Sequence, residues 1–217
     1  MKAVIKESRL DHIINCAENV FFEKGFLKTN ISDICKSANC SRTTLYSHFE
    51  SKENVYLAVV NKSFKLFISY FLKFDTEEGN GMEKILRFSK GYIDFSKKFP
   101  KNYALILDFY SILKNIKNKK IQSDTDLLLS KCSYFKTVKK NAAIPSNFLI
   151  QIIEAGQQDN SITDQIPASI LFLNMWAYLI GSSHLFNFST QKRFNILGVR
   201  MEDSEENTLA VVRKILE

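Results

Sequence analysis

The stretch ISDICKSANCSRTTLYSHFESKE, residues 31–53, decides how this chain of 217 residues is to be interpreted. It combines two cysteines, a histidine, several hydroxyl side chains and both acidic and basic residues. Such a mixture is compatible with a metal site, a catalytic cluster or a surface that lies on a nucleic acid. The positions of its apolar and helix-capping residues distinguish these alternatives.

Two short helices separated by a turn are predicted around this stretch. Asn30 can cap the first helix, with Asp33 three residues later in a variant of the capping box. Asn39 marks the turn, because asparagine tolerates the left-handed region of the backbone. Ser41 can then cap a second short helix over residues 42–48.

Longer helices flank this pair. Residues 10–21 carry an apolar stripe at the spacing of an amphipathic helix, and Gly25 suits the end of that helix. Ser51 can cap a helix that runs over about residues 52–74. One supporting helix followed by two short helices and a tight turn is typical of a helix-turn-helix, whose last helix enters the major groove of DNA.

The last short helix has the two faces that a DNA-reading helix needs. Leu45 and Phe49 form an apolar side that locks it onto the preceding helices, and its other side is polar. Arg42 is suited to a bidentate contact with guanine, and neighbouring hydroxyl, phenol, imidazole and ammonium groups are suited to bases or phosphates. The predicted DNA-binding residues are Thr29, Ser41, Arg42, Thr43, Thr44, Tyr46, Ser47, His48 and Lys52.

These residues resemble, in order and spacing over residues 9–56, the N-terminal signature of the tetracycline-repressor (TetR) family. The matching positions are Gly25-Phe26, Thr29, Asp33-Ile34, Ala38, Ser41, Thr44-Leu45-Tyr46, Phe49 and Ser51-Lys52-Glu53. Asn39 replaces the usual glycine and Cys40 a branched apolar residue, and both substitutions are compatible with the fold. Taken singly, each polar residue could be an ordinary cap or surface residue, but the joint pattern favours DNA binding.

Neither a metal site nor a catalytic centre is predicted. Cys35, Cys40 and His48 are separated by four and seven residues, unlike the ligand pairs of structural zinc sites. The other histidines, His12 and His184, have no nucleophile and orienting carboxylate at a recognisable motif spacing. A glycine-rich phosphate loop is absent from the sequence as well. We therefore expect no enzyme activity, no metal and no cofactor.

Composition and charge bound the class of protein. Hydrophobic residues make up 45% of the chain, and the scarcity of glycine (7) and proline (3) favours long helices. The net charge is +7, but residues 57–140 hold 17 basic and 8 acidic residues, against 8 and 7 in residues 1–56, so basicity alone does not locate a DNA surface. Without a secretory signal or a long apolar run, we expect reduced cysteines, a cytoplasmic location and no membrane span.

The predicted fold class is all-α. We assign residues 1–50 to a three-helix DNA-binding domain and residues 51–217 to a larger helical domain for effector binding and dimerisation. TEEGNG, residues 76–81, is the clearest linker, and the helix after Ser51 belongs partly to both regions. Further helices are predicted at about residues 82–97, 101–116, 122–140, 145–158, 167–186 and 204–216.

For the larger region, the resemblance implies a small-molecule effector and a homodimer formed through the last two long helices. Residues 167–186 are apolar nearly all round, which requires cover either from a partner subunit or within one chain. Aromatic residues crowd the middle helices, where they form core or line a pocket for an apolar or aromatic ligand. The candidate ligand-binding residues are Phe88, Tyr92, Tyr103, Tyr110 and Trp176.

The sequence thus predicts a ligand-responsive transcriptional regulator, a repressor that is released from a near-palindromic DNA operator by its effector. One alternative is a helical small-molecule-binding protein or enzyme without DNA binding. Another is a constitutive DNA-bending or activator protein without an effector. Binding to DNA separates the first alternative from the prediction, and release by a metabolite separates the second.

Overall fold

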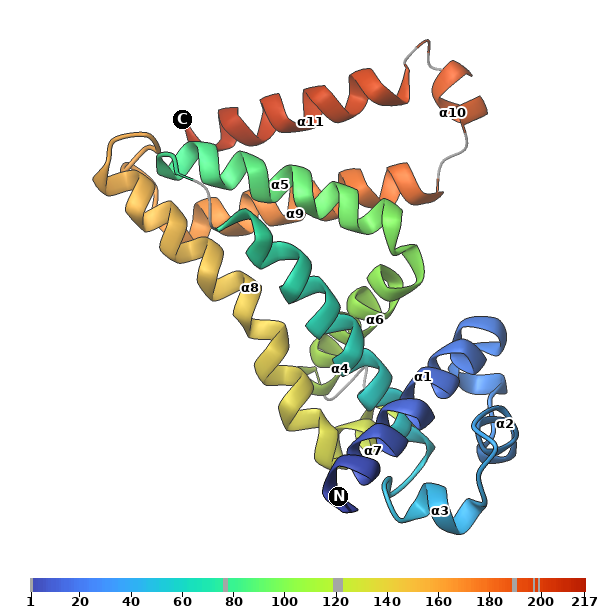
Figure 1. Ribbon diagram of the computed structural model, residues 1–217. Coiled ribbons are helices and arrows are strands. Elements are labelled where there is room, and N and C mark those ends of the chain that lie inside the picture. Colours follow the sequence, from blue (N-terminus) through green and yellow to red (C-terminus); the bar gives the residue numbers. More distant parts are fainter. Residues whose placement is uncertain (1, 76–77, 119–122, 189–190, 197, 199) are drawn as a thin grey trace. The chain divides into compact units, whose positions relative to one another are not determined.

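The computed structural model describes residues 2–75, 78–118, 123–188, 191–196, 198 and 200–217. Within these ranges the regular elements are all helices, as predicted, and no strand is present (Figure 1). The elements are α1 (Lys2–Lys28), α2 (Ile31–Ser37), α3 (Arg42–Tyr46), α4 (Lys52–Phe71), the short 3-10 helix η1 (Leu72–Phe74), α5 (Gly81–Lys98), α6 (Pro100–Lys117), α7 (Asp124–Lys131), α8 (Ser133–Gln158), α9 (Ala168–Phe188), α10 (Gln191–Ile196) and α11 (Met201–Leu216).

The chain divides into two compact units, each built from separate segments of sequence. The first unit comprises Met1–Lys65 and Ala104–Asn141, and the second comprises Leu66–Tyr103 and Ala142–Glu217. Helices α4, α6 and α8 therefore contribute residues to both units. The boundary after residue 50, which concerns a division of function, stays a prediction.

The N-terminal helices of the first unit share one apolar core. Gly25 interrupts α1 with a φ of 74° and a ψ of 165°, at the helix end that was expected, before helical turns resume as far as Lys28. Each of the first three helices contributes side chains to the core, which are at most 8% exposed. The main members are Ile13, Ala17, Val20, Phe21, Ile34, Leu45 and Phe49.

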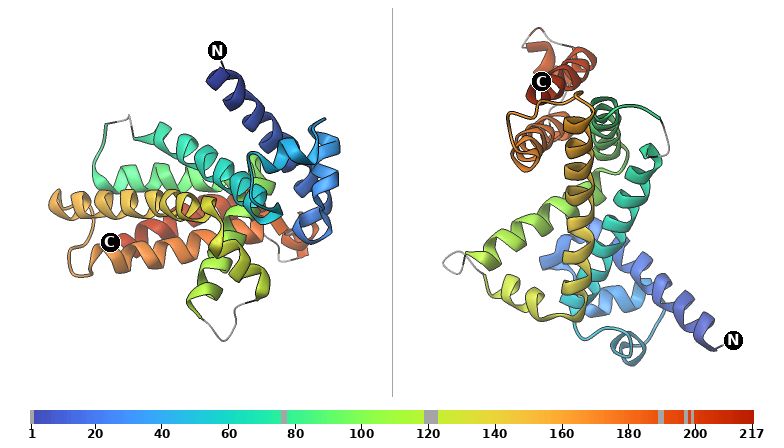
Figure 2. Two further views of the ribbon diagram at one scale, coloured as in Figure 1. Left: turned by 90° about the horizontal axis from the view of Figure 1, so that it is seen from below. Right: turned by 90° about the vertical axis from the view of Figure 1, so that its left-hand side faces the viewer.

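In the second unit, α5, α9 and α11 lie side by side (Figure 2). Helix α5 meets the end of α8 through glycine backbone, because a Cβ added to Gly81 would lie only 2.3 Å from the Cα of Gly156. The backbone N–H groups that begin α5 are capped by the loop after α8: Gly81 donates to Asp159 (2.9 Å) and Met82 to Ser161 (3.1 Å).

The predicted break within the third quarter of the chain is wrong. We expected helices at 122–140 and 145–158, but α7 ends before Cys132 and α8 then runs without interruption through Pro145. Residue 122 lies outside the described residues. Pro145 removes only one backbone hydrogen bond, and α8 is buried on both sides of it at Val138 and Leu149. The short helix α10 was not predicted.

Two helical segments, Lys52–Phe74 and Ala168–Asn187, are long and apolar enough to cross a membrane by length and composition alone, a test that core helices also pass. The absence of a membrane span stays a prediction. Burial within the protein explains the apolar character of the first segment, because 61% of its most apolar stretch is buried. For the second segment only 33% is buried, and α9 exposes Ile170 (46%), Leu173 (57%) and Leu185 (55%). Helix α9 thus exposes three large apolar side chains.

Candidate nucleic-acid interface

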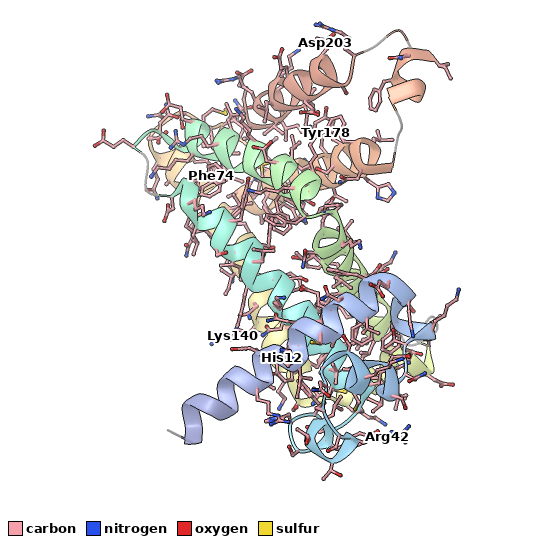
Figure 3. All side chains as sticks on the ribbon, turned by 45° about the vertical axis from the view of Figure 1, so that its right-hand side comes forward. His12, Arg42, Phe74, Lys140, Tyr178 and Asp203 are labelled. Atoms are coloured by element: carbon pink, nitrogen blue, oxygen red, sulfur yellow. The ribbon has the colours of Figure 1, made fainter. Side chains whose placement is uncertain are left out.

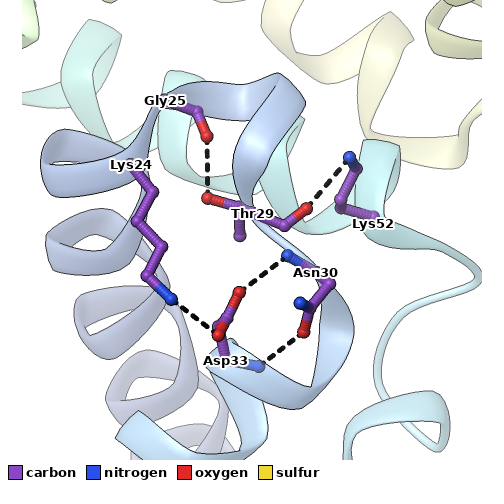
Figure 4. A network of polar contacts seen from close by, with 6 residues as sticks. All are labelled: Lys24, Gly25, Thr29, Asn30, Asp33 and Lys52. Atoms are coloured by element: carbon purple, nitrogen blue, oxygen red, sulfur yellow. Dashed lines mark hydrogen bonds and ion pairs between the residues drawn. The ribbon is translucent and has the colours of Figure 1, made fainter.

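Helix α2 is fixed at its start by a reciprocal cap (Figure 4). The Asn30 side chain accepts a hydrogen bond from the Asp33 N–H (2.9 Å), and the Asp33 carboxylate accepts one from the Asn30 N–H (3.0 Å). The Lys24 ammonium, from α1, lies 2.7 Å from the same carboxylate. These partners, Lys24 above all, hold the pKa of Asp33 below its usual value. The predicted capping box is confirmed, and it joins α2 to α1.

The turn after α2 is a Schellman motif, in which a left-handed residue closes the end of a helix. Asn39 has a φ of 46°, as predicted for this position. Its N–H donates to the Lys36 carbonyl (3.4 Å), and the Cys40 N–H donates to the Cys35 carbonyl (3.0 Å). This pair of backbone bonds satisfies carbonyls that the helix end would leave without partners, and it sets the direction in which α3 leaves.

Helix α3 begins as predicted but ends earlier. The Ser41 hydroxyl oxygen accepts the Thr44 N–H at 3.0 Å, which confirms Ser41 as the N-cap. The helix ends at Tyr46, not at His48, because the His48 N–H turns back to the Leu45 carbonyl in a tighter final turn. Leu45 is fully buried, so it holds this short helix against the core.

The outward face of α3 is polar and accessible. Arg42, Thr43 and Ser47 are exposed, as are the cap Ser41 and half of the Tyr46 side chain (52%). Thr44 and His48 are half-buried, so His48 faces solvent less fully than predicted. Figure 3 shows Arg42 extending from α3, and its guanidinium donates a hydrogen bond to the Ser32 hydroxyl of α2 at 2.5 Å.

Two of the predicted phosphate-binding residues, Thr29 and Lys52, make hydrogen bonds within the protein. The Thr29 side chain is only 2% exposed, and its hydroxyl donates to the Gly25 carbonyl at 2.7 Å (Figure 4). The Lys52 ammonium donates to the carbonyls of Phe26 and Thr29, each at 3.1 Å, and lies 4.3 Å from the centre of the Phe26 ring. Both residues therefore brace the connection between α1 and α2, and the phosphate contacts predicted for them stay predictions.

The thiols of this region are free. Cys35 is 8% exposed, Cys40 is half-buried, and Cys16 lies on α1 with its sulfur 3.7 Å from the His12 ring. Among the described residues, no group of three or more histidine, cysteine, aspartate or glutamate side chains is arranged to hold a metal ion. The polar face of α3 therefore carries the DNA-binding interpretation of this stretch.

The candidate ligand-binding residues fall into separate sets. Tyr92, Tyr103 and Trp176 meet in the second unit: the Tyr92 hydroxyl donates to that of Tyr103 at 3.0 Å, and the rings of Tyr92 and Trp176 lie 4.9 Å apart. Phe88 packs against Phe71 at 4.4 Å, and Phe71 and then Phe67 link it to Tyr92. Tyr110 belongs to the first unit, where its ring packs at the edge of a phenylalanine. Only three of the five candidates thus form one cluster.

A further polar group, which the sequence reasoning missed, lies beside this cluster. Ser183 is fully buried, and its hydroxyl makes no hydrogen bond of good geometry within the described part of the chain. Burial raises the pKa of the neighbouring Tyr103, while the hydroxyls of Tyr92 and Ser183 act in the opposite direction. A buried serine among aromatic rings has no sequence signature of its own, because only the fold brings α9 to these tyrosines.

Comparison with known proteins locates a family match over the helix-turn-helix. Residues 13–59 match the family model described as bacterial regulatory proteins of the tetR family. A relative in Staphylococcus epidermidis, the biofilm operon icaADBC HTH-type negative transcriptional regulator IcaR, is 32% identical over 95 residues, which are 43% of this chain. The match spans about half (51%) of that relative's length.

Solved structures share the fold over nearly the whole chain. The ketosteroid transcriptional regulator KstR2 of Mycobacterium tuberculosis superposes with a TM-score of 0.66 at 12% identity, over 96% of this chain and 94% of that one. The regulator AibR, solved with isovaleryl coenzyme A and operator DNA, superposes with a TM-score of 0.62 at 14% identity, over 94% and 97% of the two chains. At such identities the likeness establishes the helical fold alone.

Proposed function

We propose, from the premise that this chain belongs to the tetR family of bacterial regulatory proteins, that it is a ligand-responsive repressor of transcription. It binds a near-palindromic DNA operator as a homodimer and is released by a small apolar or aromatic effector. The observation that carries the proposal is helix α3: capped by Ser41, locked from behind by Leu45 and polar on its outer face. We place its action in the cytoplasm, where the operator would be.

The proposed DNA contacts follow from exposure and chemistry. Arg42, exposed at the start of α3, contacts a guanine, and a good bidentate pair discriminates by about 1–3 kcal/mol. The exposed Thr43 and the partly exposed Thr44 contact bases or a thymine methyl group. Tyr46 and the backbone around Ser41 contact phosphates, which fix the register of the helix. Lys52 has two ammonium hydrogens in internal bonds, so it supports a phosphate contact with the third.

The proposed dimer uses α9 and α11. Helix α9 exposes the apolar side chains of Leu173 and Leu185, and a second subunit packed there would remove them from water. Helix α11 lies beside α9. Two copies joined there would present two α3 helices to successive major grooves, about 34–36 Å apart. Leu173→Glu is expected to give monomers in sedimentation velocity, whereas Leu128→Glu, at an equally exposed leucine of α7, leaves the dimer intact.

The proposed effector site is the cluster of Tyr92, Tyr103 and Trp176 with the buried Ser183. Aromatic faces suit an apolar or aromatic molecule, and the Ser183 hydroxyl, which lies beside Tyr103, would hydrogen-bond a polar group on it. Effector binding would shift the population of dimers toward one whose α3 helices no longer match the groove spacing. Helix α4, which contributes to both units, is the proposed lever.

Footprinting on the DNA next to the protein's own gene tests the proposal. The expected result is protection of a near-palindromic site by the unmodified protein, weakened by Arg42→Ala and by raised salt. Lys140→Ala, which removes one exposed positive charge on α8, is the matched control and should leave the footprint unchanged. A protein that protects no site at low salt would instead be the helical ligand-binding protein or enzyme of the alternative.

Effector binding has an internal probe, because Trp176 is the only tryptophan in the chain. Compounds that stabilise the protein in a thermal-shift screen should also change the fluorescence of Trp176 and release the operator. Release of the operator without any effect on Trp176 fluorescence would place the effector elsewhere. DNA binding that no compound from the screen or from a metabolite extract relieves would favour a constitutive DNA-binding protein.

A further inference from the structure

The turn of the helix-turn-helix contains two cysteines in a special relation. Cys35 and Cys40 are joined by the backbone hydrogen bond of the Schellman motif that spans more residues. In it the Cys40 N–H donates to the Cys35 carbonyl at 3.0 Å. In this motif the side chains at these two positions commonly contact each other across the turn. An apolar pair usually makes that contact, and here the two positions hold free thiols, with the Cys35 thiol adjacent to that of Cys40.

The backbone geometry fits a disulfide between them. An N–H···O bond of 3.0 Å between the two residues implies that their Cα atoms lie roughly 5–6 Å apart, within the 4.4–6.8 Å that disulfides span. Cys40 is half-buried, so a small oxidant reaches it, whereas Cys35 is 8% exposed and lies behind it. Cys16 and Cys132 have no such backbone link to either residue among the bonds of the described chain.

We propose that Cys35 and Cys40 form a reversible disulfide under peroxide stress and that this bond switches off the helix-turn-helix. Peroxide oxidises the Cys40 thiolate to the sulfenic acid, releasing hydroxide. The Cys35 thiol then displaces the oxygen from the Cys40 sulfur, which gives the disulfide and water. Overall, two thiols and one hydrogen peroxide yield one disulfide and two waters, and a dithiol reverses the step.

The bond acts on DNA binding through the position of α3. Two sulfurs in contact are nearly 4 Å apart, whereas bonded sulfurs are about 2 Å apart and need a Cβ–S–S–Cβ dihedral near 90°. Although the Cα atoms already lie within disulfide range, closure turns the two Cβ atoms toward each other and reorients the backbone of Cys40. Cys40 directly precedes Ser41, the N-cap of α3, and α3 is only five residues long. So short a helix keeps its position only through its cap and its buried face. Moving its first residue displaces Arg42 from the groove.

The ordinary state of the pair is reduced. Burial and the adjacent Cys35 thiol raise the pKa of Cys40, against a smaller opposing effect of the Arg9 charge. A thiol of raised pKa reacts slowly with peroxide at neutral pH, because the thiolate is the reactive form. The switch therefore responds to sustained oxidation and not to the traces of peroxide that are always present.

Peptide mapping by mass spectrometry tests the site without reference to DNA. The full-length protein is treated with millimolar hydrogen peroxide, blocked with iodoacetamide and digested. The expected product is a Cys35–Cys40 linked peptide that disappears with dithiothreitol. A product that links Cys40 to Cys16, or sulfinic acid at Cys40 without any linkage, would overturn the proposal.

The effect on the operator rests on the proposed function, and it is measured separately. Oxidised protein should bind the footprinted operator at least tenfold more weakly than reduced protein and recover with dithiothreitol. Cys35→Ala and Cys40→Ala should each bind normally and become insensitive to peroxide, whereas Cys16→Ala and Cys132→Ala stay sensitive. A Cys35–Cys40 linked peptide together with unchanged operator binding would refute the switch alone. A reduced protein that binds no DNA would refute the proposed function, and the peptide mapping would still decide whether the disulfide forms.

Discussion

Replacing Gly81 with alanine tests the closest approach of two helices in the second unit. The added Cβ would lie 2.3 Å from the Cα and 2.7 Å from the N of Gly156, and 3.1 Å from the carbonyl oxygen of Ile152. Carbon atoms in good contact are about 3.5–4.0 Å apart, so α5 and the end of α8 would have to separate by roughly 1.2–1.7 Å. All three neighbours are backbone atoms, which cannot rotate away.

We therefore expect Gly81→Ala to lower the free energy of unfolding by about 3 kcal/mol, the upper end of the usual cost of overpacking. For a chain of this size that loss corresponds to a fall in melting temperature of roughly 6–12 °C. Urea denaturation followed by circular dichroism, with a thermal melt of the same samples, measures both quantities. Because Gly81 is the first residue of α5, the helix propensity of alanine compensates little.

Two other glycines serve as controls. At Gly181, on the exposed face of α9 proposed for the dimer, an added Cβ meets no atom of its own chain within 4 Å, so in the monomeric Leu173→Glu background Gly181→Ala should stabilise the protein by up to about 1 kcal/mol. At Gly156 the nearest obstacle is the flexible Ile162 side chain at 2.6 Å, so Gly156→Ala should cost less than Gly81→Ala. Equal stability of Gly81→Ala and the unmodified protein would refute this reasoning.

Three further perturbations have defined outcomes. Asn30→Ala removes the capping box of α2 and should cost about 1 kcal/mol in urea denaturation. Hydrogen bonds from Ser161 and a backbone N–H lower the pKa of Asp159 in the folded protein. The carboxylate therefore stabilises the fold fully above its unfolded pKa of 3.8, and this stabilisation is lost as the pH falls through the lower folded pKa. Asp159→Asn should accordingly flatten the drop in melting temperature below about pH 4. Tyr103→Phe removes the hydrogen bond from Tyr92 and should cost about 1 kcal/mol, with a weaker response of Trp176 to effector.

Local signals in the sequence were sufficient to predict the helix-turn-helix. The caps at Asn30 and Ser41, the left-handed Asn39 and the stop at Gly25 each depend on the chemistry of one residue and its immediate neighbours. Such signals are visible without the fold. The buried Leu45 follows from the same reasoning, because a helix this short needs an apolar side chain facing its support.

The break between α7 and α8 depends on a distant residue and could not be predicted in this way. Asn54 on α4 is 1% exposed; its side-chain amide donates to the Ser133 hydroxyl at 3.2 Å, and its oxygen accepts the Tyr134 N–H at 3.3 Å. A residue about 80 positions away thus caps the start of α8. Local rules instead favoured a break near Pro145, where α8 in fact continues.

The candidate sites show the same limit. Arg42, Thr43 and Tyr46 lie on the exposed face that their sequence positions indicate. Thr29 matches the family signature equally well, yet its hydroxyl is turned inward to a backbone carbonyl. The aromatic candidates were chosen by composition, and only their contacts in the fold separate the cluster at Trp176 from ordinary core packing.

The ratio of two affinities tests most directly whether α3 reads DNA sequence. Fluorescence anisotropy at one fixed salt concentration would measure binding of the reduced protein to its footprinted operator and to a random duplex, for the unmodified protein and for Arg42→Ala. The loss of one guanine contact predicts roughly 5- to 150-fold weaker binding to the operator, with a smaller change on the random duplex. Equal losses on both duplexes, or no loss on either, would contradict a reading role for Arg42.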